Sequence, residues 1–389
     1  MTLPVSGAMR LGGNVNVELG LAATAQISMG SAAVRGLYGV ASGAISLAAN
    51  GYGKTGTAVP FSWSTTGAIP NSLGTPTWTS VCVNSSGLYV AVGYTTTGSS
   101  PLYSTSTDGI TWTTAAYMNG STAVAKMQSV TVNSSGLFVA VGFGASSQAM
   151  YATSSDGSTW TTPAVMNGSA VNADMRGVAV NAAGLFVAIG VGGSTLRPYF
   201  ATSSNGSTWT SPALVNGYNV ISRMNAICVN LSGVFVAVGY NGSAVGIYAT
   251  STDGSTWTTP APINGATAHS IMQAVTASPS GLFVAVGDNV NIPGFATSTD
   301  GYTWTTPAAM VGGGLAATMY GVAASLSGQF VAVGYTATPT SRYSSSLDGT
   351  TWALPTAISS STSKFVAIAV NSANKFVALG ANGTIAVGT

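Results

Sequence analysis

Phe138-Val139-Ala140-Val141-Gly142 is one of seven copies of the apolar five-residue motif that decides the fold of this 389-residue chain. The copies begin at residues 89, 138, 186, 235, 283, 330 and 376, so they recur every 46 to 49 residues. A fixed period in this range is typical of repeat proteins, in which one unit cannot bury its apolar face alone and neighbouring units share a core. We therefore expect the seven units to form one structure.

A second motif, Ser-x-Asp-Gly-x-Thr-Trp, lies between the apolar copies. It begins at residues 106, 154, 251, 298 and 346, and a sixth copy at residue 203 has Asn205 in place of Asp. Each repeat has period-2 alternation and turn residues that predict four short strands, for example 129–133, 137–143, 149–154 and 158–162. Four strands in about 48 residues make one propeller blade. The sequence thus predicts an all-β, seven-bladed β-propeller with four-stranded blades.

The last repeat has no Trp motif, because the sequence given stops after residues 384–389, where its third strand is expected. Trp63 precedes Ser80 by 17 residues, as Trp112 precedes Ser129. Residues 61–63 therefore occupy the register of a fourth strand. We predict that this N-terminal strand completes the last blade, closes the ring and removes two exposed sheet edges. The predicted domains are residues 1–55, which lack the repeat, and a propeller of residues 56–389.

The chain has few charges: 10 Lys or Arg and 8 Asp or Glu, or 5% of all residues, against about 25% in typical soluble domains. The formal net charge of +2 supplies no basic patch, so we expect no nucleic-acid partner. Gly, Ser and Asn interrupt every apolar run well before the ~20 residues that span a bilayer, which argues against membrane insertion. Residues 1–9 lack the basic start and apolar stretch of a secretory signal.

The Trp motif resembles the Asp-box of bacterial-neuraminidase-like propellers, with one residue fewer between Asp and Gly. An Asp at the start of a tight turn can accept hydrogen bonds from the following backbone N–H groups, and the Trp can fill the space between sheets. We therefore assign these Asp residues a structural role.

An apolar residue also precedes each expected first strand. We expect these seven residues to pack around the inner rim of the propeller, and we favour this role over a ring that binds a ligand. These residues are Trp78, Met127, Met175, Met224, Met272, Met319 and Phe365.

The two ends of the predicted propeller differ in how much their loops vary. First-to-second loops such as 84–87 and 133–136 are short and repetitive, and the third-to-fourth loops are the Asp turns; we call this end the turn face. The other end, which we call the variable face, has a different loop in each blade, at 93–102, 142–149, 190–198, 239–246, 287–294 and 334–342. Diversified loops on a rigid scaffold are where binding specificity usually resides, although repeat drift without selection would diversify them too.

Most of the charges outside the Asp turns are also predicted to lie on the variable face, and Tyr residues there could stack on sugar rings. Lys364 belongs to this set, whereas Lys375 is the exception on the turn face. The candidate binding residues are Lys126, Asp174, Arg176, Arg197, Arg223, Tyr240, His269, Asp288, Tyr335 and Arg342.

The sequence favours no enzymatic activity. The predicted propeller contains no Glu, and Asp174 and Asp288 are its only carboxylates outside the turns, whereas glycosidases usually need two suitably separated carboxylates. His269 lacks a nucleophile-elbow motif, and metal-ligand clusters and phosphate-binding glycine loops are absent from the sequence. No metal, catalytic residue or cofactor is expected.

Residues 1–55 carry motifs of their own: SGAMRL at 6–11, GNVNVELG at 13–20, AQISM at 25–29, AVR at 33–35, SGAISL at 42–47 and YGK at 52–54. This segment resembles one found in tailed-bacteriophage virion proteins, with Arg10 where Ser is usual. The resemblance implies a tail-tip, baseplate or fibre component, synthesised in the host cytoplasm, whose residues 1–55 attach to other virion tail proteins.

The combined interpretation is a virion tail protein whose propeller binds a host-surface glycan or protein, as one of several copies that strengthen weak contacts. A purely structural tail protein without host contact is the first alternative. A secreted lectin-like or sialidase-like propeller is the second, opposed by the missing signal and the missing carboxylates.

Overall fold

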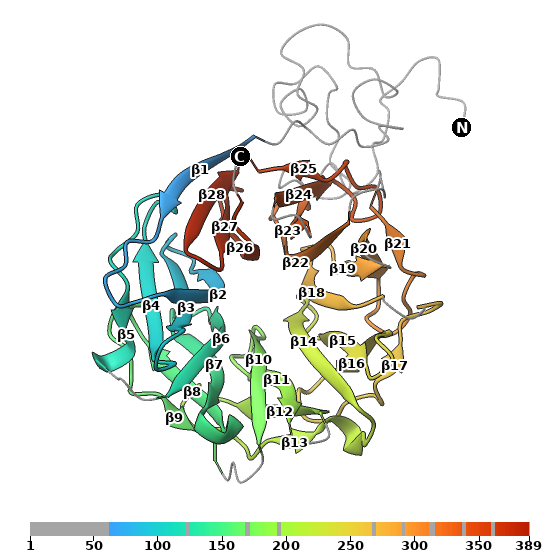
Figure 1. The fold of residues 1–389 in the computed structure, drawn as a ribbon. Helices are drawn as coiled ribbons and strands as arrows, with labels where there is room; N and C mark the ends of the chain where they lie inside the picture. The colour runs from blue at the N-terminus through green and yellow to red at the C-terminus, as the bar shows by residue number, and fades with distance from the viewer. Residues whose placement is uncertain are drawn as a thin grey trace, which may run out of the picture. The chain divides into compact units, whose positions relative to one another are not determined.

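The computed structural model describes residues 62–388 apart from 121–123, 168–171, 193–195, 267–269, 290–291, 311–315, 337–339 and 359–361. The chain divides into two units, Met1–Thr57 and Ala58–Thr389, and every described residue belongs to the second. The attachment segment predicted at residues 1–55 lies outside the described residues. The second unit is a ring of seven four-stranded antiparallel sheets (Figure 1), which confirms the predicted seven-bladed β-propeller.

The strands are grouped below by their order in each blade. The first strands are β2 (Pro76–Val83), β6 (Ala125–Val132), β10 (Ala173–Val180), β14 (Ser222–Val229), β18 (Met272–Ala277), β22 (Ala317–Ala324) and β26 (Phe365–Val370). The second strands are β3 (Tyr89–Thr95), β7 (Phe138–Gly144), β11 (Phe186–Gly192), β15 (Phe235–Asn241), β19 (Phe283–Asn289), β23 (Phe330–Thr336) and β27 (Phe376–Gly380). The third strands are β4 (Pro101–Ser106), β8 (Ala149–Ser154), β12 (Arg197–Ser203), β16 (Gly246–Ser251), β20 (Ile292–Ser298), β24 (Ser341–Ser346) and β28 (Thr384–Gly388). The outer strands are β5 (Ala116–Tyr117), β9 (Ala164–Val165), β13 (Ala213–Leu214), β17 (Ala261–Pro262), β21 (Ala308–Ala309), β25 (Thr356–Ala357) and β1 (Trp63–Ala68).

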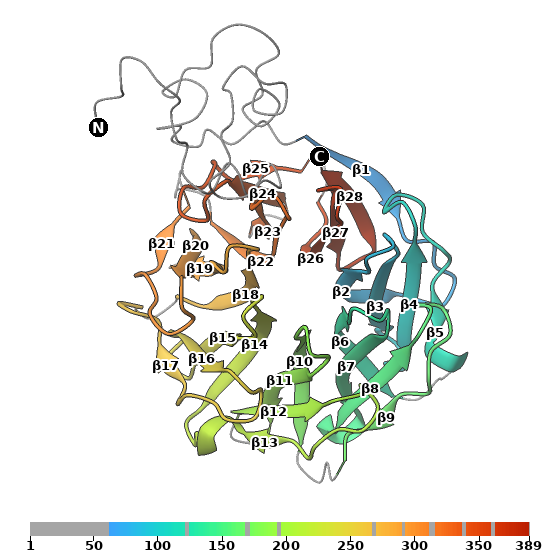
Figure 2. The same ribbon diagram turned by 180° about the vertical axis from the view of Figure 1, so that it is seen from behind.

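Three single-turn 3-10 helices complete the described elements: η1 (Met118–Gly120), η2 (Ala145–Ser147) and η3 (Val215–Gly217). The first strands of neighbouring blades contact one another and border the centre of the ring in both views (Figure 1, Figure 2). Blades 1 to 6 begin with β2, β6, β10, β14, β18 and β22, and blade 7 begins with β26.

The strand bounds predicted for blade 2 agree with the structure for the third strand, and the second is offset by one residue. The first strand is longer than predicted. The predicted fourth strand at 158–162 is wrong, because the backbone N–H groups of Ser158 and Thr159 donate to Asp156 Oδ1 instead of entering the sheet. The outer strand of this blade is the two-residue β9, which follows that turn.

The predicted closure by an N-terminal strand is confirmed. Strand β1 pairs antiparallel with β28, with Trp63 opposite Gly388 and Ala68 opposite Thr384, and completes the sheet of blade 7. Of the predicted residues 61–63 only Trp63 lies in β1, which begins there and continues to Ala68. Its six residues make β1 longer than the two-residue outer strands of the other blades.

Aromatic pairs join neighbouring blades at six of the seven junctions of the ring. The Trp of one blade lies 5.7 to 6.2 Å, between ring centroids, from an aromatic residue on the third strand of the preceding blade. Trp63 continues this series against Tyr343 at 5.7 Å, although no Asp turn precedes it. The pairs are Tyr103–Trp160, Tyr151–Trp209, Phe200–Trp257, Tyr248–Trp304, Phe295–Trp352 and Tyr343–Trp63.

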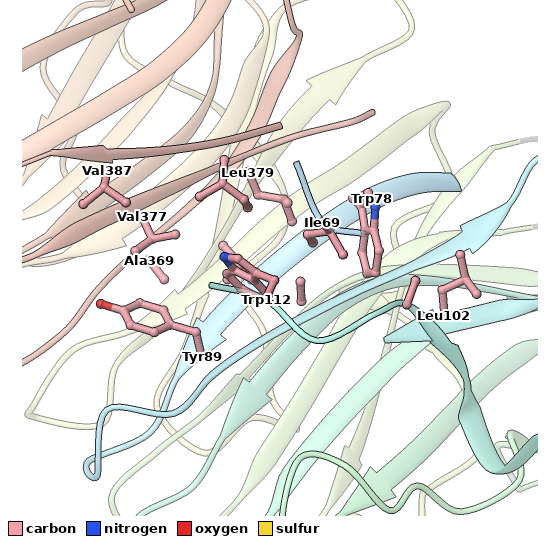
Figure 3. Packing of buried hydrophobic residues seen from close by; sticks show 13 residues of the cluster. Ile69, Trp78, Tyr89, Leu102, Trp112, Ala369, Val377, Leu379 and Val387 are labelled. Carbon is pink, nitrogen blue, oxygen red and sulfur yellow. The ribbon is translucent and has the colours of Figure 1, made fainter. Parts of the chain in front are cut away.

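The junction between blades 7 and 1 is built differently. Ile385 replaces the aromatic residue there, and Trp112 lies 6.5 Å from Tyr89 of its own blade. Figure 3 shows this cluster, in which Trp112 lies near Val377 and Leu379 of blade 7. Blades 7 and 1 therefore meet in an apolar core like those between the other blades. The ring of Trp78, five Met residues and Phe365 is also fully packed in these cores, as expected.

Candidate binding site

The turn face has the same geometry in every blade. Asn84 Oδ1 accepts hydrogen bonds from the backbone N–H groups of Ser86 and Leu88. The bond from the residue four positions on recurs in the other six first-to-second loops, where an Asn or Ser side chain is the acceptor. Gly87, at φ 87°, supplies the left-handed residue that this turn requires. Seven equivalent turns leave little room for a site that depends on differences between blades.

The Asp turns lie on the same face and stabilise it. Asp108 Oδ1 accepts hydrogen bonds from the N–H groups of Ile110 and Thr111, at 2.7 Å each, and Trp112 Nε1 donates to the Gly109 carbonyl. The hydrogen bond from Thr111 is the main reason why the pKa of Asp108 falls to about 2. Asn205 makes the same two backbone contacts, so this turn needs an oxygen acceptor and not a charge. The structure thus supports the structural role assigned to these residues.

A β-bulge lies near the start of every first strand. In each blade the register between the first and second strands shifts by one residue. The shift comes immediately after the buried Trp78, Met or Phe365 residue of that blade. All seven extra residues are half-buried on the strands that border the ring centre. They are Thr79, Gln128, Arg176, Asn225, Gln273, Tyr320 and Val366. We call these the bulge residues.

Bulge residues make contacts between neighbouring first strands. Thr79 Oγ1 donates to the Met127 carbonyl of the next blade at 2.8 Å, and Asn225 Nδ2 donates to the Met272 carbonyl at 2.9 Å. Bulges commonly redirect a side chain near functional sites. The seven equivalent positions carry different chemistry, so the inner ring differs from blade to blade even though its backbone repeats.

Two further positions of each blade lie beside the bulge, toward the variable face. The first position comes directly before the buried Trp, Met or Phe of its blade, in or just before the first strand. It is occupied by Thr77, Lys126, Asp174, Arg223, Ile271, Thr318 and Lys364. The second position lies opposite the first, in or just after the second strand. It is occupied by Tyr94, Phe143, Val191, Tyr240, Asp288, Tyr335 and Ala381. We call these fourteen residues the rim. Six of the ten predicted site residues belong to the rim, and Arg176 is a bulge residue beside it.

Charged groups from blades 2, 3 and 4 meet at one part of the rim. Asp174 is close enough to Arg176, Lys126 and Arg223 for all three cations to act on its ionisation, and it also hydrogen-bonds Ser147. Burial nevertheless raises the pKa of Asp174, and burial lowers that of Arg176. The Oδ1 atom of Asp174 and the Nε atom of Arg176 are buried without hydrogen-bond partners. This cluster therefore contains three cations and a single partly desolvated carboxylate.

Aromatic rings flank two of the three cations of this cluster, Lys126 and Arg223. Lys126 Nζ lies 5.3 Å from the ring centroid of Tyr94 in blade 1 and 5.6 Å from that of Phe143. Arg223 Cζ lies 5.8 Å from the ring of Tyr240. Such cation–π contacts hold the charges close to aromatic surfaces.

A second group lies on blades 6 and 7. The rings of Tyr320 and Tyr335 stack with centroids 5.0 Å apart, and the Tyr335 hydroxyl donates to that of Tyr320 at 3.1 Å. The exposed Lys364 places Nζ 4.5 Å from the Tyr335 centroid and 5.1 Å from that of Tyr320. Burial, with the hydrogen bond from Tyr335, raises the pKa of Tyr320 to about 12, so the Tyr320 hydroxyl stays neutral below alkaline pH.

The structure separates other predicted site residues from these groups. Arg197 and Arg342 lie on third strands, opposite Gly192 and Gly334, and so at the variable-face end but farther from the ring centre than the rim. Tyr103 and Tyr343, on third strands, pack against Trp residues. His269 lies outside the described residues.

Two contributors were missed by the sequence reasoning. Tyr320 gave no signal of its own, because its role follows from the bulge that places it beside Tyr335. Phe143 was counted only as a strand residue, and its position opposite Lys126 was the available clue. In the part of the chain that the structure describes, no group of three or more His, Cys, Asp or Glu residues could hold a metal ion. No helix within those ranges has the length and hydropathy to span a bilayer.

No known family model matches the sequence, and no curated protein matches it. The fold does resemble solved structures. A structure of YCF48 bound to D1 peptide has a TM-score of 0.58 at 16% identity, over 85% of this chain and 97% of that chain. A streptogramin B lyase has a TM-score of 0.64 at 10% identity, with the same coverage of 85% and 97%.

A third similar structure, the GH74 xyloglucanase from Xanthomonas campestris, has a TM-score of 0.56 at 14% identity, over 84% of this chain and 53% of that one. Identities this low show a shared fold alone. The class that the fold defines is the β-propeller, and the site must be interpreted from its own residues.

Proposed function

We propose that this protein is a virion tail component whose propeller binds a receptor on the host surface, either a glycan or a protein. Residues 1–55 would attach it to other tail proteins in several copies, as their resemblance to tailed-bacteriophage proteins implies. The propeller would act without catalysis or cofactor, since Asp174 and Asp288 are its only carboxylates outside the Asp turns.

One observation supports the binding role: the repeat keeps the same turns at one end of every blade and varies its residues at the other end. The first-to-second turns keep the same hydrogen bonds in all seven blades, whereas the seven rim positions on the first strands carry Thr, Lys, Asp, Arg, Ile, Thr and Lys. A brace would need no such chemical variety at one end. The solved relative bound to a peptide is an example of a propeller with a protein ligand, and the same scaffold supports many functions.

Binding of the full chain to cells of the host tests this proposal. Beads that display many copies should bind host cells, and a Lys126→Gln, Arg223→Gln double variant should bind several-fold less. Lys375→Gln, on the turn face, is the matched control. A full chain that binds no cell the parent virus infects would contradict the receptor role.

The virion role needs a separate measurement. Antibodies against the propeller should label the tails of purified particles, and particles grown with a chain that lacks residues 1–55 should lose this label. Unlabelled tails, or labelling that survives the deletion, would contradict the attachment role of this segment.

A further inference from the structure

The propeller has a strongly polarised distribution of its few charges. Its described residues include seven Lys or Arg and seven Asp, which cancel. The turn face holds Asp108, Asp156, Asp253, Asp300, Asp348 and Lys375, so its net charge is 1 − 5 = −4. The variable-face end holds Lys126, Arg176, Arg197, Arg223, Arg342, Lys364, Asp174 and Asp288, so its net charge is 6 − 2 = +4.

The strand order requires this separation. In each antiparallel sheet the first-to-second and third-to-fourth connections lie at the same end. A direct contact agrees with it, because Lys375 Nζ, in a first-to-second loop, donates to the carbonyl of Asp108, in a third-to-fourth turn, at 2.6 Å. A neutral propeller thus presents one cationic end, and clusters of one sign attract ligands of the other sign.

The cationic end also contains a local excess of positive charge. Lys126, Arg176 and Arg223 share one carboxylate, Asp174. The Arg223 charge helps to lower the pKa of Arg176, so these two guanidinium groups repel each other. A carboxylate or phosphate group bound beside them would offset this repulsion and could accept charge-assisted hydrogen bonds.

The aromatic neighbours indicate what kind of molecule carries the anion. Tyr94, Tyr240 and the stacked Tyr320–Tyr335 pair lie beside Lys126, Arg223 and Lys364, respectively. A Tyr ring offers an apolar face to a sugar ring and a hydroxyl for its polar edge. Cation and ring therefore recur side by side at three places on the rim, which suits a polymer of charged sugars better than an acidic peptide.

We propose that the variable face binds anionic glycans, with the acidic groups of the sugar chain beside Lys126, Arg223 and Lys364 and the sugar rings against the adjacent Tyr side chains. This inference rests on the proposed receptor-binding function and specifies its ligand class. The shared chemistry is an acidic group on a saccharide, and carboxylate and phosphate polymers are the two sources to be distinguished.

The first experiment measures binding of the full chain to immobilised polymers. The probes are polygalacturonate, the same polymer with its carboxylates methyl-esterified, a glycerol-phosphate teichoic acid that carries sugars, and poly-glutamate. We expect binding to one or both acidic glycans that weakens as salt rises, little binding to the ester, and at least about tenfold weaker binding to poly-glutamate. Equal binding to the acid and the ester would overturn the proposal, as would tighter binding to poly-glutamate than to either glycan.

The second experiment compares matched charge variants. Lys126→Gln, Arg223→Gln and Lys364→Gln should each weaken glycan binding about tenfold, the effect of losing one hydrogen bond to a charged group. Lys375→Gln, on the turn face, should leave it unchanged. Because Lys364 is exposed, its variant tests the site even if the half-buried Arg223 variant folds poorly. Equal losses in the Lys364 and Lys375 variants would refute the assignment.

The outcomes separate this inference from the receptor function. If the chain binds host cells, yet acidic glycans do not compete and the three variants bind normally, the glycan assignment is wrong and the receptor role stands. If the acidic glycans bind as expected but no host cell does, the ligand class stands and the adhesive role falls.

Discussion

Gly239→Ala is the most severe test of the close packing between the first and second strands of one blade, beside the bulge. A Cβ atom on Gly239 would lie 2.8 Å from the carbonyl carbon of Arg223 and closer still to its oxygen. Non-bonded carbons rest about 3.5 to 4.0 Å apart, so the strands must separate by about 0.7 Å or more. The φ angle of Gly239 is not in the left-handed region, and the cost is therefore steric.

The expected loss of stability combines two effects. Overpacking costs about 1–3 kcal/mol, and strand separation weakens one or two hydrogen bonds of about 1 kcal/mol each, which gives about 4 kcal/mol. A propeller unit of roughly 330 residues has an unfolding entropy near 0.7 kcal/mol/K, so Tm should fall by about 6 °C. Calorimetry or Trp fluorescence during thermal unfolding would measure this shift.

Gly380→Ala is an internal control, because Gly380 ends the same motif in blade 7. A Cβ there would lie 3.0 Å from Asn382 Oδ1, the end of a side chain that can rotate away, and 3.3 Å from Ser363 Cβ, a contact that a shift of a few tenths of an ångström would relieve. We expect a change in Tm within about 2 °C. A Gly380→Ala variant as unstable as Gly239→Ala, or a Gly239→Ala variant as stable as the wild type, would refute the steric argument.

Three further results are expected. Deletion of residues 1–68 should expose the edge of β28 and cause concentration-dependent association in gel filtration, whereas deletion of 1–61 should leave β1 and a monodisperse ring; equal behaviour would contradict the closure model. The pKa of Asp156 is lowered to about 2, so its stabilising charge is present above the ordinary value of 3.8 and is lost as pH falls toward 2. Asp156→Asn, which recreates the turn at Asn205, should therefore lose less stability than the wild type between pH 5 and pH 2 in urea titrations. Thr79→Val removes the 2.8 Å hydrogen bond to the next blade and should lower the free energy of unfolding by about 1 kcal/mol in the same assay. An unchanged free energy of unfolding would show that this bond does not stabilise the ring.

The repeat architecture could be predicted from the sequence because it depends on a period and on alternation, both of which are visible in the residues. The outer strands could not, since 158–162 alternates like a strand while the Asp156 carboxylate captures its N–H groups. Most charged residues outside the Asp turns could be assigned to the variable face, because the order of the strands along the chain places each loop at one end of the blade or the other. Their grouping could not, because the bulge at Arg176 adds one residue without disturbing the apolar pattern. Contacts such as Lys126 with Tyr94 join different blades, and a single repeat contains no information about its neighbour.

The closing strand β1 has a consequence for how the chain acquires its fold. Trp63 and Gly388 are paired although 388 − 63 = 325 residues separate them. Joining positions so far apart costs about 5 kcal/mol of chain entropy, and contacts of such long range slow folding. A six-residue closing strand offers more pairing to offset this cost than a two-residue one. During synthesis, β1 lacks its partner strand until residues 384–388 have left the ribosome, so the earlier blades must persist with an open edge. We therefore expect ring closure to be the late, cooperative step, and the stage at which a nascent chain is most exposed to aggregation.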